Sequence, residues 1–463
     1  MDPRGTVLDE ADIYVEDGLI SAVAPDQPPF NLESADQTIQ AKGCNVLPGF
    51  VNAHGHVSLG LMRGLGEFIP GLSWEHYFDR QGNLTQQLTE EDYYLGAQLL
   101  IAEMIRAGIT SFADIHFEGP GSKPITDLIA QAVESCGIRA VLCLETSGYL
   151  NIGGTHMIYS REETDRSYQH SRAFINKWQG KAGGRITTML GLGDPPVPTR
   201  YDMELVAQGS SEAAVPIQMH VAEIPYEMEE WQKIYKKRPF EMLLETGILD
   251  HHVLGGNVVF MDKHDAAIVK DHSFHASTCP KNCCKMSLGM LDIPMLIALG
   301  VNVCLGTNEM ANNNRLDMIE EMRMAALYHK MQQNDPYVLS GDLPLRLVTE
   351  HSGRALGTGA GVLAHGRPAD IIIMDRKNPH MHPDHDPLAN VIYSSSAADT
   401  RTVMIAGRVI MQDGKLLTFD DQTVIEQLER SLSSKRVKIP APYFGAGPAS
   451  FQVKWEVDRS DEI

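Results

Sequence analysis

Two histidines in the segment His54-Gly55-His56 have the spacing of a metal site. They follow an apolar run at 46–51 that favours a strand. Residues i and i+2 of a strand point to the same face, so both imidazoles can reach one cation. A second apolar run ends in His220, and Glu223 follows it. His220 adds a third nitrogen and Glu223 a carboxylate close by, so these residues together predict a metal site for hydrolysis.

The apolar runs of the chain must supply the scaffold for these side chains. Eight runs resemble strands that are buried on both faces, at 46–54, 110–116, 139–146, 185–193, 216–220, 256–261, 273–277 and 301–307. Segments with helical spacing, such as 91–107 and 316–329, separate several of them. This alternation predicts an α/β fold, a closed (β/α)8 TIM barrel.

Polar side chains gather where these strands end. In a barrel of this kind the chemistry lies at the carboxyl ends of the strands. The residues predicted at this rim are His54, His56, His116, Glu145, Asp194, His220, Glu223, Asn257, Thr278 and Asn308. We therefore expect them to share one site, and His116 is a candidate for contact with substrate or metal.

Both ends of the chain have a different pattern. Residues 11–24 predict a hairpin with Asp17-Gly18 as its turn. The segments 369–374 and 403–417 show the same pattern and predict further β-strands and turns. We expect 1–46 and 357–420 to form one small β-sandwich domain beside the barrel at 47–356. Residues 421–463 are expected to form a C-terminal helix and an aromatic tail, and that tail favours a homo-oligomer.

Composition excludes several classes of partner. The net charge of −21 argues against nucleic acid and anionic membranes. No apolar run approaches the ~20 residues that span a bilayer, and the first residues lack the pattern of a signal peptide. Seven cysteines spread along the chain suit reduced thiols. The sequence therefore predicts a cytoplasmic protein acting on a small molecule.

Several motifs in combination resemble those of the amidohydrolase superfamily, in its s-triazine hydrolase and atrazine chlorohydrolase branch. The resemblance covers nearly the whole chain and rests on 47–56, 107–110, 220–223, 305–307, 313–323 and 368–372. It implies one divalent transition metal, zinc foremost, with cobalt, iron or manganese as other choices. The family pattern implies His54, His56 and His220 as ligands, with further site positions at Asn257, Thr278 and Asn308.

Those three last positions depart from the family pattern, which has histidine, histidine and aspartate there. Asn257 offers the metal an amide oxygen, a weaker ligand than imidazole for zinc-like ions. Asn308 is neutral and cannot act as a base. Three histidines still meet the minimum of a catalytic zinc site. Loss of the aspartate makes the centre more positive, which lowers the pKa of bound water and leaves Glu223 to transfer protons.

The resemblance also suggests substrate contacts. The segment after the first barrel strand contributes to the substrate wall in this branch, so Trp74 and Phe78 imply a flat or apolar substrate. We place Thr278 among the substrate-binding residues and count Asn308 and His116 with Glu223 as candidate catalytic residues.

Three functions remain open. The first is a hydrolase that cleaves a C–N, urea, carbamate or thiocarbamate bond of a small apolar molecule, as herbicide hydrolases of this superfamily do. The second is an amino- or chloro-hydrolase of a triazine, purine or pyrimidine ring, against which the missing aspartate weighs. The third is a non-catalytic binding protein on the same scaffold.

Overall fold

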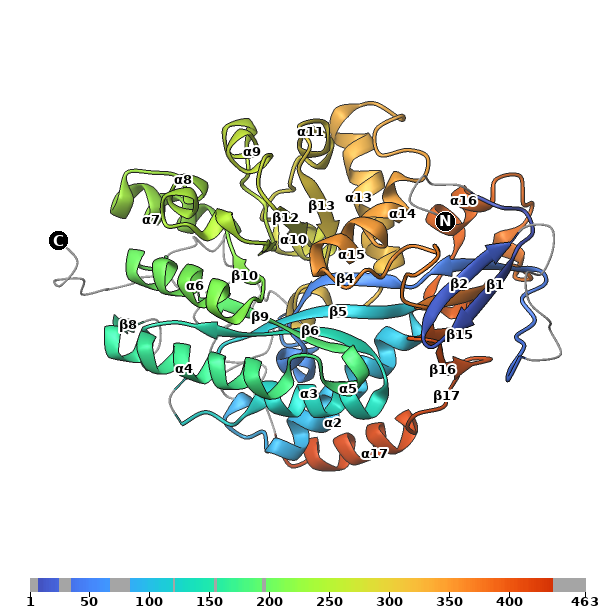
Figure 1. Cartoon of the computed structure of the whole chain (residues 1–463), viewed down its shortest axis with the longest axis horizontal. Helices are drawn as coiled ribbons and strands as arrows, with labels where there is room; N and C mark the ends of the chain where they lie inside the picture. The colour runs from blue at the N-terminus through green and yellow to red at the C-terminus, as the bar shows by residue number, and fades with distance from the viewer. Residues whose placement is uncertain are drawn as a thin grey trace, which may run out of the picture.

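The computed structural model describes residues 7–24, 35–66, 84–119, 121–153, 156–193 and 197–435 of the 463-residue chain. Eight parallel strands form its central sheet (Figure 1). In chain order they are β4 (Phe50–Gly55), β5 (Ile109–His116), β6 (Arg139–Thr146), β9 (Ile186–Leu192), β10 (Ile217–His220), β11 (Val253–Gly256), β12 (Phe274–Thr278) and β13 (Asn302–Leu305).

The sheet closes between its last and first strands. The peptide N–H groups of Thr307 and Asn308 both donate to the carbonyl oxygen of His54, at 2.9 and 3.1 Å, and Gly55 pairs with Asn308 in a parallel bridge. The predicted (β/α)8 barrel is therefore confirmed. The contact that closes the barrel joins two candidate site residues, His54 and Asn308, so closing the barrel also fixes their relative position.

Helices cover the outside of the barrel (Figure 1). They are η2 (Val57–Met62), α2 (Glu90–Arg106), α3 (Ile125–Cys136), α4 (Arg161–Trp178), α5 (Lys181–Gly184), α6 (Arg200–Ala213), α7 (Pro225–Tyr235), α8 (Pro239–Glu245), η3 (Ile248–Asp250), α9 (Lys263–Val269), α10 (Pro280–Met286), α11 (Ile293–Ala298), α12 (Met310–Asn313), α13 (Met318–Gln333), α14 (Leu343–Leu347) and α15 (Glu350–Leu356). Helix α2 begins at a capping box, in which Thr89 and Asp92 satisfy each other's peptide N–H groups. A short antiparallel pair, β7 (Tyr149–Gly153) and β8 (His156–Tyr159), precedes α4.

Segments from both chain ends build a second, antiparallel sheet, as predicted. Its order is β17 (Lys415–Leu416), β16 (Arg408–Gln412), β15 (Thr400–Ile405), β14 (Ile371–Asp375) and β3 (Cys44–Pro48). The hairpin of β1 (Asp12–Glu16) and β2 (Leu19–Ala24) turns at Asp17 and Gly18, both with positive φ, as the sequence predicts. An apolar cluster around Ile20 and Ile371 joins the hairpin to the sheet.

One buried ion pair links this sheet to the barrel. The guanidinium of Arg139, the first residue of β6, donates to both carboxylate oxygens of Asp370, at 2.7 and 3.0 Å. Asp370 also accepts the peptide N–H of Ala406, and its carbonyl accepts that of Gly49. The contact therefore fixes the point at which the chain passes from the sheet into β4.

Short helical turns connect β14 to β15 within the second sheet, and the chain returns to the barrel after β17. These turns are η4 (Pro379–Met381), α16 (Pro387–Ala389), η5 (Asn390–Ser394) and η6 (Ala397–Asp399). Helix α17 (Asp421–Leu432) packs on α2, where Ser431 and Lys435 bind the carboxylate of Asp92 at 2.6 and 2.5 Å. None of the helices in the described ranges is long and apolar enough to cross a membrane. All seven cysteines carry free thiols.

Two predicted strands were wrong in their bounds. The run 46–54 is two strands, β3 and β4, which meet at Gly49, where a Cβ would lie 2.1 Å from the Thr110 side chain. The run 256–261 is a loop, because β11 ends at Gly256 and Asn257 has a left-handed backbone with φ of 47°. Val258, Val259 and Met261 are buried as loop residues instead.

Candidate metal centre

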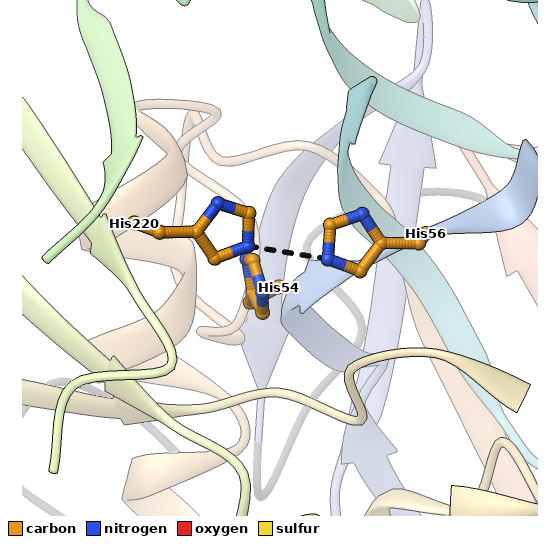
Figure 2. Close-up of side chains that lie close together, drawn as sticks. All are labelled: His54, His56 and His220. Atoms are coloured by element: carbon orange, nitrogen blue, oxygen red, sulfur yellow. Dashed lines mark hydrogen bonds between the residues drawn. The ribbon is translucent and has the colours of Figure 1, made fainter. Parts of the chain in front are cut away.

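Three imidazoles meet at the carboxyl end of the barrel. His54 lies in β4, His56 directly follows that strand and His220 ends β10. A ligand nitrogen of each lies within 4.8 Å of the other two, and the ring centroids are 4.9–5.1 Å apart. Figure 2 shows His220 and His56 facing each other, with His54 beside them. The structure thus brings together the three predicted ligands from two elements far apart in sequence.

The nitrogens of this group fit a metal ion. The Nε2 atoms of His56 and His220 are 3.2 Å apart, close to the ~3.3 Å between two nitrogens bound at ~2.05 Å to a tetrahedral zinc. His56 uses Nδ1 to donate to the carbonyl of Ile115 at 2.9 Å, which leaves the lone pair on Nε2. Both ring nitrogens of His54 are buried without a hydrogen-bond partner. A bound cation would satisfy that buried group.

Electrostatics keeps the imidazoles of His54 and His56 neutral. Burial lowers the pKa of His54 well below its ordinary value, and the neighbouring His220 and His56 lower it further. Burial and then His220 lower the pKa of His56 to about 3. Because a metal binds the neutral imidazole, this environment favours a cation over protons. The carboxylate of Glu145, at the end of β6, lies 3.8 Å from Nδ1 of His220 on the other side of that ring.

Glu223 stands on a fixed turn after β10. The peptide N–H groups of Ala222 and Glu223 both donate to the carboxylate of Glu227, at 2.8 Å each, and Trp231 donates to the same carboxylate at 3.1 Å. Ala222 has a positive φ of 55°, a conformation that these bonds support. The turn therefore sets the position of the candidate proton-transfer group. Sequence reasoning missed Glu227, although an acid in the first turn of α7 was a visible signal.

Asn308 lies beside the histidines as predicted. It follows β13 with a left-handed backbone, φ 57°, which asparagine adopts more readily than most residues. Its side chain is close enough to His54 and His56 to oppose the lowering of their pKa values. The position can therefore reach the metal site, but an amide there supplies neither charge nor a base.

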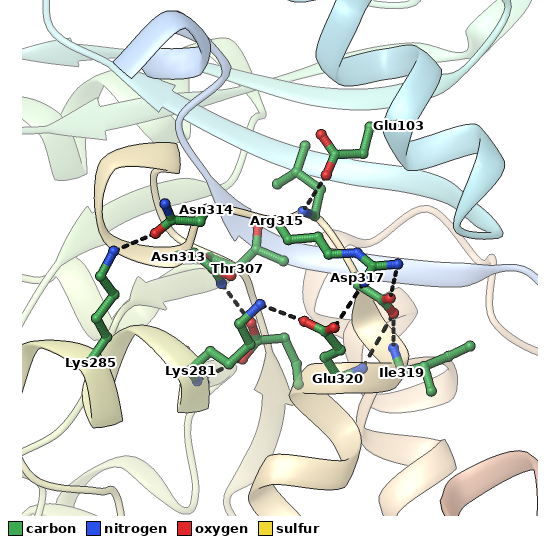
Figure 3. A network of polar contacts seen from close by, with 12 residues as sticks. Glu103, Lys281, Lys285, Thr307, Asn313, Asn314, Arg315, Asp317, Ile319 and Glu320 are labelled. Carbon is green, nitrogen blue, oxygen red and sulfur yellow. Dashed lines mark hydrogen bonds and ion pairs between the residues drawn. The ribbon is translucent and has the colours of Figure 1, made fainter. Parts of the chain in front are cut away.

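The loop that carries Asn308 is held by a polar network (Figure 3). The amide of Asn313 donates to the carbonyl of Thr307 and to Glu321, at 2.6 Å each. The peptide N–H of Lys281 donates to Glu321 at 2.9 Å, and the Lys281 ammonium binds Glu320 at 2.5 Å. These contacts tie the strand-eight loop to α10 and α13, so Asn308 sits on a rigid support.

The other predicted site residues divide into three groups. His116 ends β5, and burial lowers its pKa to about 4; it also lowers the pKa of His56, so it lies beside the histidines. Asn257 donates to Glu223 at 2.6 Å and receives the Cys283 thiol, so its predicted metal ligation stays a prediction. Thr278 is fully buried with its hydroxyl 4.0 Å from Cys283 Sγ. Its predicted substrate contact stays a prediction too. Trp74, Phe78 and Asp194 lie outside the described residues.

Comparison with known proteins places these features in a family. The model of the Amidohydrolase family matches residues 45–410. The chain is 33% identical over 433 residues to a 5'-deoxyadenosine deaminase of Methanosarcina mazei, covering 93% of this chain and 95% of that protein. It is 34% identical over 422 residues to a 5-methylthioadenosine/S-adenosylhomocysteine deaminase of Syntrophomonas wolfei, covering 90% and 93%.

A solved structure shares the fold at lower identity. The zinc complex of an atrazine chlorohydrolase from Arthrobacter aurescens superposes with a TM-score of 0.83 and 23% identity, covering 93% of this chain and 97% of that chain. The superfamily prediction is therefore confirmed, whereas the triazine branch is not. The relatives above 30% identity act on adenosine-type nucleosides by name.

Proposed function

Because this chain belongs to the amidohydrolase family and is a hydrolase of C–N bonds other than peptide bonds, we propose that it deaminates an adenosine-type nucleoside. The observation that carries the proposal is the group of three imidazoles with Glu223 on the adjoining turn, in a chain alike over its length to such deaminases. The ring amino-hydrolase, an alternative at the sequence level, is thus favoured over cleavage of a urea or carbamate.

The chain's own residues divide the work between binding and proton transfer. His54, His56 and His220 would hold one divalent transition metal, zinc foremost. Such an ion supplies the Lewis acid that makes water nucleophilic at neutral pH. Asn308 cannot take a proton from the attacking water, so the Glu223 carboxylate would accept that proton and pass it to the substrate. The oxygen of water forms a C–O bond at the ring carbon and the C–N bond to the amino group breaks; one water proton ends on the ring product and the other on the amino group, which leaves as ammonia.

One observation favours a second candidate function. Asn308 stands where the family pattern has an aspartate, and ring deamination relies on that base. A carbonyl substrate, such as a urea, carbamate or thiocarbamate, needs less help because its oxygen is polarised directly. This substrate class therefore belongs in the same assay.

The test is product release by the metal-loaded protein: ammonia from the nucleosides, and the leaving amine, alcohol or thiol from the comparison panel. The nucleoside panel is 5'-deoxyadenosine, 5'-methylthioadenosine, S-adenosylhomocysteine and adenosine, and the comparison panel is phenylureas, carbamates and thiocarbamates. We expect turnover of a nucleoside, and a loss of about 10²–10⁴-fold in kcat for Glu223→Gln with metal content unchanged. Release from the comparison panel alone would support the second candidate. Bound metal without turnover on either panel would contradict both and favour a binding protein.

A further inference from the structure

The amide of Asn257 bridges two side chains, the half-buried Glu223 and the buried Cys283. Its Nδ2 donates to Oε1 of Glu223 at 2.6 Å, and Sγ of Cys283 lies 3.9 Å from its Oδ1. Asn257 is fully buried. A hydrogen bond from an amide to a carboxylate is charge-assisted and about twice as strong as a neutral one. Both polar ends of Asn257 are therefore engaged.

The chemistry of the partners fixes which way this amide points. A carboxylate accepts hydrogen bonds and repels a carbonyl oxygen, so the NH₂ group of Asn257 must face Glu223. Oδ1 then faces Cys283, which is suitable because burial raises the pKa of that thiol to about 12 and keeps its S–H donor. Reversing the amide would place oxygen against oxygen on one side and two donors together on the other.

The two loops that carry Asn257 and Glu223 are also joined through the backbone. The peptide N–H groups of Val259 and Phe260 donate to the carbonyl of Ala222 at 3.0 and 2.8 Å. The loop after β11 is thus attached to the turn after β10, one residue before Glu223. The side-chain bond between Asn257 and Glu223 acts across loops that are already in register.

Thr278, where the family pattern also has histidine, lies beside Asn257 and Cys283. The hydroxyl of Thr278 lies 4.0 Å from the Cys283 sulfur, so a polar chain runs from Thr278 through Cys283 and Asn257 to Glu223. Thr278 and Asn257 are both fully buried. Two positions where the family pattern has histidine therefore converge on the carboxylate that transfers protons.

We propose that Asn257 is a positioning residue that holds the Glu223 carboxylate in place for proton transfer, with Cys283 orienting its amide. The role differs from the metal ligation that the family pattern implies for this position, and it rests on the proposed function of Glu223. Binding a metal through Oδ1 would require the amide to leave the thiol and turn its NH₂ group away from Glu223. A misplacement of about 1 Å in a reacting group can cost 10²-fold in rate, so this contact matters for turnover.

Two variants test the role, and Asn302→Ala is the matched control. Asn257→Asp is isosteric and replaces the donor with a carboxylate, whereas Asn257→Ala removes the side chain. Asn302, at the opposite end of the barrel, donates its amide to the carbonyl of His351. We expect about one equivalent of zinc in all three variants. Both substitutions of Asn257 should lower kcat about 100-fold with KM within threefold, while Asn302→Ala keeps the parent's kcat.

Crystal structures of the zinc-loaded parent and of Asn257→Ala give a readout independent of turnover. We expect the Glu223 carboxylate to contact residue 257 in the parent and to move in the variant. If the parent deaminates no nucleoside, the proposed function fails, but this comparison still decides the positioning role. Loss of zinc from Asn257→Ala with retention in Asn257→Asp would identify a metal ligand and overturn the proposal. So would an unmoved Glu223 or an unchanged kcat.

Discussion

Replacing His54 by alanine should remove the response of the protein to zinc. Both ring nitrogens of His54 are buried without a partner, and the imidazole stands within 5.0 Å of the rings of His56 and His220. The folded apoprotein therefore carries an uncompensated polar group that a cation would satisfy. Metal that binds the folded chain and not the unfolded one stabilises the fold by mass action.

The magnitude follows from the affinity and the chain length. With free zinc at about 1,000 times its Kd, the gain in unfolding free energy is about 4.1 kcal/mol. An unfolding entropy of about 2.1 cal/mol/K per residue gives about 1 kcal/mol per degree for 463 residues. We therefore expect zinc to raise the Tm of the chelator-treated parent by about 4 °C and to leave His54→Ala unchanged.

The assay is thermal unfolding with elemental analysis of the same samples. His275→Ala is the matched control, because His275 is also buried in a barrel strand with an unpartnered Nδ1 but lies at the other end of the barrel, where its ring is tilted against that of His252 with centroids 4.4 Å apart. This control should keep the full zinc shift and about one equivalent of metal. An equal shift in His54→Ala, or no zinc uptake by the parent, would refute the assignment of the three histidines.

Three further predictions concern charge. Asn308→Asp places a carboxylate beside the histidines, so zinc should bind roughly 10–100-fold more tightly in a chelator competition; weaker binding would contradict the placement of that side chain. Arg139→Met leaves Asp370 buried and unpaired, which should cost about 3–5 kcal/mol in urea unfolding, whereas a cost below 1 kcal/mol would show the pair to be dispensable. Burial raises the pKa of Glu321 from its ordinary 4.5 to about 7, so the folded chain keeps a proton that the unfolded chain has lost. That contribution to stability is complete below pH 4.5 and lost by pH 7. Relative to Glu321→Gln, the parent should thus lose roughly 3 kcal/mol over this range, and parallel pH curves would contradict the shift.

Most of the barrel could be predicted because its strands are continuous apolar runs. The predicted 110–116 and 139–146 match β5 and β6 within one residue. The error at β11 has a physical cause: the strand has four residues and ends in Gly255 and Gly256, while the more apolar 258–261 lies beyond the left-handed Asn257. Periodicity cannot separate a short buried strand from a buried loop.

The site was predictable where it is local in sequence. His54 lies in β4 and His56 directly follows it, and Glu223 stands three residues after His220, so each of these two groups follows from a short motif. The contact between Asn257 and Glu223 depends instead on how two loops meet across the barrel and on which atom of an amide faces a carboxylate. The spacing of residues in the sequence predicts neither the meeting of the loops nor the orientation of the amide. The family pattern led instead to the prediction that Asn257 binds the metal.

The substitutions at 257 and 308 make chemical sense as a pair. An amide at Asn308 removes a negative charge beside His54 and His56, and with it the family's base. The N–H of Asn257 donates to the Glu223 carboxylate and so restricts where that carboxylate can lie. We propose that this positioned carboxylate accepts the proton that an amide at position 308 cannot take. The three histidines and the positioned Glu223 are all retained. We therefore infer that proton transfer has moved from position 308 to Glu223, and that the site has not lost its catalytic function.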